Sequence, residues 1–276
     1  MQETFNNSKF NIKTLEDKAD NVERLYAEAG LKINPTSELW ELMVSAREVS
    51  KSINNMVDMR LLFKSFHLER IESVLSLLKN EEQKSKYLKD VLNGRLDFFI
   101  HEPSHAKSIL WELEVWKKIK KAIPESYLEE PDVVLNIGDM KISVPCKKIT
   151  SENGVSKVLS NAVSQIERSF EFGIVAMNID DLVPEKTVLN ARTFSEAADK
   201  LHSVNMEFLA RHQHHFLRYL NKSRITAVVA STSMIIDIHD ELPKYNNASQ
   251  WAIWTIPDLN DRHKSAIEEF KCKVLG

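Results

Sequence analysis

The sequence predicts an α/β fold with a mixed central sheet flanked by helices, preceded by a helical N-terminal region. Apolar residues recur at helical spacing through residues 1–100, whereas short β-type runs alternate with helical stretches after residue 104. The 276 residues suffice for one large domain or two small ones. We place a boundary near residues 95–105. Residues 1–100 would then form a helical region and residues 101–276 an α/β domain.

The N-terminal region carries helix signals and no strand-like alternation. Asn34–Pro35 is a start signal for a helix through "SELWELMVSAREVSKSI". The segment "MVDMRLLFKSFHLERIESVLSLL" repeats the same apolar spacing. We expect this region to be helical throughout and to contact a protein partner.

The elements after residue 104 follow one another as helix, hairpin, helix, strand, helix and strands. "SHAKSILWELEVWKKIKKAI" predicts a helix, and Gly138–Asp139 predicts a tight turn between the strands "DVVLNI" and "KISVPCK". The remaining predicted elements are a helix in "SKVLSNAVSQIERSFEF", a buried strand in "GIVAMNI", a helix over 194–222, strands in "RITAVVAS", "MIIDI" and "WAIWTI", and a last helix in "DRHKSAIEEFKCKVL".

Composition excludes several classes of protein. The net charge of −3 provides no global basic field, so a nucleic-acid ligand would need a local basic patch. The two cysteines imply no disulfide framework and no zinc site built from CxxC pairs, and they favour a cytoplasmic location. The sequence contains no glycine-rich phosphate loop and no apolar run of about 18 residues, so we expect neither a P-loop nor a membrane span.

Polar residues on the apolar faces of two predicted helices are candidates for a site. Glu112 lies within about 60° of the centre of the first helix's apolar stripe, where a carboxylate needs a partner or a metal. Glu114 points nearly opposite, and we expect it to be solvated. In the second helix, Gln165 is an amide on a mostly apolar stripe.

The predicted hairpin brings an acid and a lysine together. Pairing about the turn places Asp132 near residues 144–147. Alternation puts Pro145 and Lys147 on one face of the strand and turns Cys146 to the other, where its thiol would be packed and would not act as a nucleophile.

This ordered set resembles the PD-(D/E)XK nuclease superfamily. A helix glutamate, "PD", a hairpin, a "CKK" strand end, a helix with "QI" and then "GIVAMNI" follow one another over residues 105–180. The resemblance implies a restriction-endonuclease-like fold and a Mg²⁺ or Mn²⁺ ion. It implies that Asp132 is the main metal ligand, Lys147 the catalytic lysine, Glu112 the helix acid, and Gln165 a group that positions the substrate or the lysine.

Pro145 departs from the superfamily pattern, which has Asp or Glu two residues before the lysine. In one interpretation the metal is held by Asp132, Glu112 and a main-chain carbonyl of Pro145 or Cys146. In the other, the site is degenerate and the domain binds without cutting. We favour the first, with the Cys146 carbonyl as a ligand, because Glu112, Asp132, Lys147 and Gln165 occur together.

Basic residues suggest contacts to a phosphate backbone. The stretch "RHQHHFLRYLNKSR" at 211–224 offers Arg211, Arg218 and Lys222 on a helix, and Lys148 is either a surface charge or a phosphate contact. A solvated helix is the plain alternative. His212 and His215 at i, i+3 have no acid or cysteine at metal-site spacing, which argues against a metal there.

The sequence thus predicts a metal-dependent nuclease that acts on DNA or RNA, with DNA favoured, and with a role as the effector of a bacterial defence system as one extension of the resemblance. One alternative is a catalytically inactive nuclease-like fold that binds nucleic acid or acts as a scaffold. Another is a protein-interaction module dominated by helices.

Overall fold

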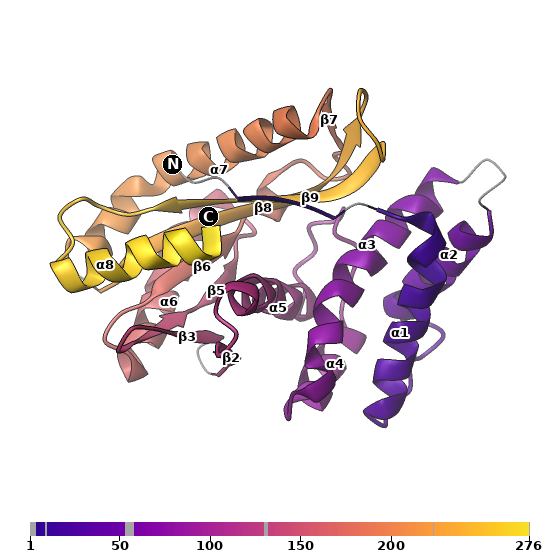
Figure 1. Cartoon of the computed structure of the whole chain (residues 1–276), viewed down its shortest axis with the longest axis horizontal. Helices are drawn as coiled ribbons and strands as arrows, with labels where there is room; N and C mark the ends of the chain where they lie inside the picture. Colours follow the sequence, from indigo (N-terminus) through magenta and orange to yellow (C-terminus); the bar gives the residue numbers. More distant parts are fainter. Residues whose placement is uncertain (1–3, 9, 53–57, 130–131, 223, 276) are drawn as a thin grey trace.

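The computed structural model describes residues 4–8, 10–52, 58–129, 132–222 and 224–275 (Figure 1). They form a mixed α/β fold with two sheets. Glu130 and Pro131, the latter part of the predicted "PD" motif, lie outside the described residues. Strands run through the segment from Val133 to Asn178, so this part of the chain is not helical alone, and the helix-dominated interaction module stays an alternative that the fold does not support.

Four α-helices make up most of the described N-terminal region, and they lie side by side at one end of the molecule (Figure 1). The Ser37 side chain caps the second helix by accepting from Trp40 N at 3.2 Å, and Asp58 caps the third by accepting from Arg60 N at 2.8 Å. The helices are α1 (Leu15–Glu28), α2 (Glu38–Lys51), α3 (Met59–Leu75) and α4 (Lys84–Leu92).

The expectation of a wholly helical N-terminal region is wrong in one respect. The strand β1 (Thr4–Ser8) pairs antiparallel with β9 (Tyr245–Trp254), from Thr4↔Trp251 to Ser8↔Asn247. A strand of five residues is too short to produce a clear period of two, and its pairing is made by main-chain groups that are common to every sequence. The start of the chain therefore completes the sheet of the C-terminal part.

The larger sheet has the order β1-β9-β8-β6-β5, with β7 paired to β8. The strands β5, β6 and β8 are parallel to one another, and β9 is antiparallel to β8. "RITAVVAS" and "MIIDI" form one long strand rather than two. The bounds are β5 (Cys146–Lys148), β6 (Ile174–Asn178), β7 (Leu189–Ala191) and β8 (Ala227–Ile238).

The smaller sheet contains the predicted hairpin. The strands β3 (Val133–Ile137) and β4 (Met140–Val144) pair from Val133↔Val144 to Ile137↔Met140, and β2 (Tyr127–Leu128) pairs with β3. Gly138 has φ +59° in the turn, a conformation that glycine adopts without strain. The predicted turn is confirmed.

Pro145 marks the point where the chain passes from one sheet to the other. The stretch "KISVPCK" divides into β4 before the proline and β5 after it. Ser143 forms a parallel bridge with Gly173, and a Cβ at Gly173 would lie 2.4 Å from the Ser143 carbonyl oxygen. Glycine is therefore required where β4 meets the start of β6.

Helices cover both faces of the larger sheet (Figure 1). One face presents Ala176 and Val229 to a core that includes Trp116 of α5 and Phe270 of α8. The opposite face presents Val175 to α6 and α7. The bounds are α5 (His105–Ala122), α6 (Val155–Ser169), α7 (Phe194–Leu220) and α8 (Asp261–Phe270).

No helix within the described residues is both long enough and apolar enough to cross a membrane.

Candidate functional site

Asp132 and Lys147 meet where the two sheets join. The Asp132 carboxylate oxygen Oδ2 accepts a hydrogen bond from Cys146 N at 2.5 Å and another from Lys147 Nζ at 3.1 Å. Asp132 has φ +69°, a left-handed conformation that Asp tolerates better than most residues. Side-chain exposures of 16% for Asp132 and 20% for Lys147 leave this ion pair open to a ligand.

Glu112 reaches the same place from α5. Burial is the main cause, and the negative charge of Asp132 the second, of a rise in the pKa of the Glu112 carboxyl to about 7. Lys147 and Lys86 oppose this shift, as does a hydrogen bond of 2.9 Å that Tyr87 Oη donates to Glu112 Oε1. Glu112, Asp132 and Lys147 therefore lie close enough for their charges to interact. The structure brings these three predicted residues together.

Tyr87 is a member of the site that the sequence reasoning missed. It lies on α4, in the N-terminal region that was assigned to partner binding. Burial and the neighbouring Glu112 carboxylate raise the pKa of its phenol, so Tyr87 stays a hydrogen-bond donor. Its apolar ring fits the helical stripe of α4, and nothing in its spacing indicates a polar role.

The two main-chain carbonyls considered as metal ligands point in opposite directions. The Pro145 oxygen accepts a hydrogen bond of 2.9 Å from Ala176 N in β6, so it belongs to the sheet. The expectation that the Pro145 carbonyl could be a ligand is therefore wrong. Directions alternate along a strand, so the Cys146 carbonyl points away from β6, on the side where Cys146 N meets Asp132.

The Cys146 thiol is packed, as expected. It is buried, it donates to Val144 O at 3.3 Å, and burial raises its pKa well above the usual value. A protonated, buried thiol is a poor nucleophile.

The donor set fits a hard cation. Asp132, Glu112 and the Cys146 carbonyl are oxygen donors, which Mg²⁺ and Mn²⁺ prefer. Asp132 Oδ1 accepts no hydrogen bond from the described residues. Burial and the Asp132 carboxylate raise the pKa of Glu112, and a bound cation would stabilise the ionised form of Glu112. Among the described residues, no group of three His, Cys, Asp or Glu side chains gathers as a metal site, so water would complete the coordination.

Gln165 is half-buried on α6, and this helix packs against β5 and β6. It lies beside Ile166, whose side chain belongs to the core on that face of the sheet. A role for Gln165 in positioning the substrate stays a prediction.

Lys148 does not form a surface charge. Its side chain is only 7% exposed, and Nζ contacts Asp181 Oδ1 at 2.8 Å and Asn178 Oδ1 at 3.1 Å. Because β5 turns Lys148 toward the end of the neighbouring strand, the ammonium pairs inside the protein and is not free for a phosphate contact.

Glu114 is also not solvated, contrary to expectation. Its carboxylate accepts from Arg70 Nε at 2.5 Å and from Arg70 Nη2 at 2.9 Å, and the same Nη2 donates to Asp180 Oδ2 at 3.0 Å. The helical-wheel argument assumed that α5 packs on one side only. In the structure α3 covers its second side and supplies Arg70.

The basic stretch on α7 is partly neutralised. Arg211 pairs with Glu152 at 2.8 Å, and His212 contacts the same carboxylate. Arg218 and Lys222 are exposed and make no ion pair with the described residues. They stay candidates for a phosphate contact.

A scan against protein-family models and a search of curated proteins found no match to this chain.

Proposed function

We propose that the protein is a metal-dependent nuclease of the PD-(D/E)XK type, with a restriction-endonuclease-like fold. The proposal is carried by one observation, the convergence of Glu112, Asp132 and Lys147 at the junction of the two sheets. Two further features support it. The hairpin leads into a strand that pairs in parallel with β6, and α5 lies against that strand.

Each residue would have a distinct role. Asp132, Glu112 and the Cys146 carbonyl would hold Mg²⁺ or Mn²⁺. When bound, the ion would acidify a water molecule and stabilise negative charge on the phosphate. Lys147 would contact the attacked phosphate or the nucleophilic water, because its side chain stays partly exposed while its ammonium pairs with Asp132. Tyr87 holds the Glu112 carboxyl in place.

A second candidate function is nucleic-acid binding without cleavage. The observation that favours it concerns Pro145, which stands where the superfamily has its second acid. Its side chain cannot bind a metal, and its carbonyl accepts a hydrogen bond from Ala176 N. In this alternative the Asp132–Lys147 pair only fastens the hairpin to β5.

A cleavage assay separates the two. Single- and double-stranded DNA and RNA are incubated with the protein and Mg²⁺ or Mn²⁺. The variants are Asp132→Asn and Lys147→Ala. Their controls are Asp139→Asn, at an exposed acid in the hairpin turn, and Lys32→Ala, at an exposed lysine. We expect cleavage, favouring DNA, that both site variants reduce at least ~100-fold and both controls preserve. Stable binding without cleavage under either metal would support the second function.

The resemblance also suggests a defence role, while the low cysteine content suggests a cytoplasmic location and the N-terminal helices suggest a protein partner. All three stay predictions from the sequence.

A further inference from the structure

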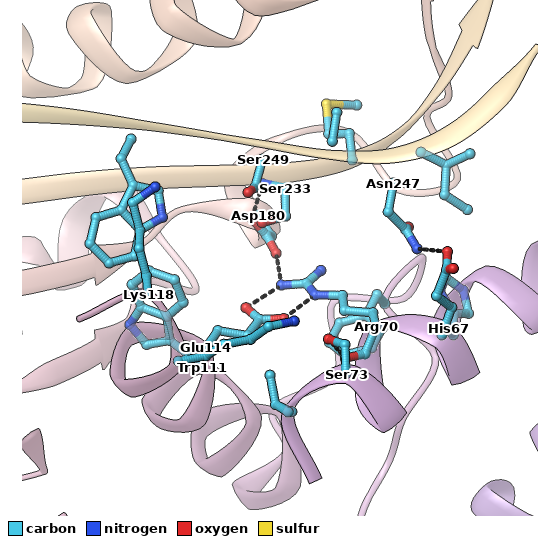
Figure 2. Close-up of a pocket in the computed structure, with 18 of the residues that line it drawn as sticks. His67, Arg70, Ser73, Trp111, Glu114, Lys118, Asp180, Ser233, Asn247 and Ser249 are labelled. Atoms are coloured by element: carbon cyan, nitrogen blue, oxygen red, sulfur yellow. Dashed lines mark hydrogen bonds and ion pairs between the residues drawn. The ribbon is translucent and has the colours of Figure 1, made fainter. Parts of the chain in front are cut away.

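A cavity lies on the other side of α5 from Glu112. It has a volume of about 980 Å³ and is enclosed by α3, α5, β8 and β9. Figure 2 shows side chains from the strands and from the helices pointing into the space between them. This volume is within the range of pockets that hold small organic ligands. We call it the α3–α5 cleft.

The cleft is basic in a protein whose net charge is negative. Of the described residues that line it, eight are Lys or Arg and three are Asp or Glu. The three carboxylates are already paired, two with Arg70 and one with Lys18. Lys120 and Lys273 pair with Glu81 and Glu269 outside the lining, so the four remaining lysines supply the charge that is available to an incoming anion.

Two half-buried lysines of α5 line the cleft. Lys117 and Lys118 make no hydrogen bond or ion pair with the described residues. Lys118 Nζ lies 5.0 Å from the ring centroid of Trp251, and burial lowers its pKa to about 8. An ammonium held in this environment gains when an anion binds beside it.

The remaining walls suit the body of a polar organic molecule. Ser233 and Ser249 face each other across β8 and β9, and their hydroxyls make no hydrogen bond with the described residues. Phe98 is half-buried, and the Arg70 guanidinium lies 4.2 Å above its ring. Met234 and Val183 add partly exposed apolar surface. The cleft thus combines cations, hydroxyls and flat apolar surface.

We propose that the α3–α5 cleft binds a nucleoside phosphate. The phosphates lie at Lys117 and Lys118, the sugar hydroxyls meet Ser233 and Ser249, and the base packs against the apolar wall beside Phe98. A single ligand of this class satisfies all three kinds of wall, whereas a simple phosphate would leave the hydroxyls and the apolar wall unused. The site is distinct from the Asp132 site because Glu112 and Glu114 point to different sides of α5.

The test is isothermal titration calorimetry with ATP, AMP, adenosine and pyrophosphate in the presence of EDTA. We expect saturable binding of ATP or AMP, and binding of adenosine and pyrophosphate at least ~10-fold weaker, since each lacks one part of the ligand. Lys118→Ala should weaken nucleotide binding ~10-fold or more, and Ser249→Ala about threefold. Neither side chain has a hydrogen bond to lose, so both variants should fold.

Matched controls locate the site. Lys32→Ala and Ser160→Ala remove exposed groups outside the cleft and should bind as the wild type does. Absence of nucleotide binding at millimolar ligand would overturn the proposal, as would pyrophosphate binding as tightly as ATP. If Lys118→Ala binds nucleotide with the same affinity as the wild type, the binding site is not in the α3–α5 cleft.

This inference does not depend on nuclease activity. Because EDTA removes divalent cations, metal binding at Asp132 takes no part in this measurement. A protein that binds ATP but cuts no nucleic acid would refute the proposed function alone, and the reverse result would refute the cleft proposal alone.

Discussion

Glu112 and Glu114 lie two residues apart on α5, yet the protein treats their charges in opposite ways. Glu114 is held by Arg70, which also binds Asp180. Glu112 is influenced by the charge of a second carboxylate, receives only a phenol hydroxyl as a hydrogen-bond partner among the described residues, and has its pKa raised to about 7. The difference shows which side of the helix is built for stability and which is left short of positive charge. A buried carboxylate that is short of a cation is a candidate for a functional site.

The largest effect is expected when the ion pairs of Glu114 and Asp180 with Arg70 are removed. Arg70→Ala would leave Glu114 and Asp180 buried without a cation, so it should destabilise the fold by about 3–5 kcal/mol. Urea unfolding followed by circular dichroism measures this. Arg60→Ala, at an exposed position of the same helix, should change stability little. Equal effects of the two variants would mean that Arg70 is only a surface charge.

On the side of α5 that carries Glu112, removal of the Glu112 negative charge should stabilise the protein. The folded-state pKa of Glu112 lies above its ordinary value of 4.5, so the folded state holds the proton more tightly than the unfolded state does. The wild type therefore loses stability as the pH rises from about 4.5 to about 7, by up to about 3 kcal/mol. Glu112→Gln should recover most of this at pH 8 and little at pH 4.5.

Its matched control is Glu114→Gln, which weakens the Arg70 pair and should destabilise at pH 8. If both variants shift the stability in the same direction at pH 8, the contrast between the two sides of α5 does not hold.

A smaller effect is expected at the junction that positions the site. Gly173→Ala would place a methyl group 2.4 Å from the Ser143 carbonyl oxygen, so we expect a loss of about 1–3 kcal/mol in the free energy of unfolding. Because β4 would have to move away from the methyl group, this substitution should also weaken metal binding at Asp132. Gly30→Ala, where no atom lies within 4 Å but φ is +69°, separates backbone strain from crowding. A Gly173→Ala variant as stable as the wild type would mean that the junction adapts freely.

The sequence could predict the local part of the site. A turn at Gly138–Asp139 fixes the register of the hairpin, and that register places Asp132 near Lys147 without knowledge of the remaining fold. The same local reasoning predicted the helices and most strands, because burial on one side produces a visible period.

Contacts between distant segments could not be predicted in this way. Tyr87 and Arg70 reach α5 from helices whose packing is not encoded in their own spacing. Lys148 pairs with Asp181, which lies 33 positions later in the sequence and comes close only because β5 pairs with β6. Each missed or misjudged residue depends on how elements that are far apart in the sequence pack together.

The central claim is that Glu112 of α5 and Asp132 together bind a divalent cation. Calorimetric titration of the protein with Mn²⁺ at pH 7 tests it most directly. We expect one ion to bind with release of a proton from Glu112, and Asp132→Asn and Glu112→Gln to weaken binding at least ~10-fold while Asp139→Asn does not. No binding at millimolar Mn²⁺, or equal binding by Asp132→Asn, would contradict the account.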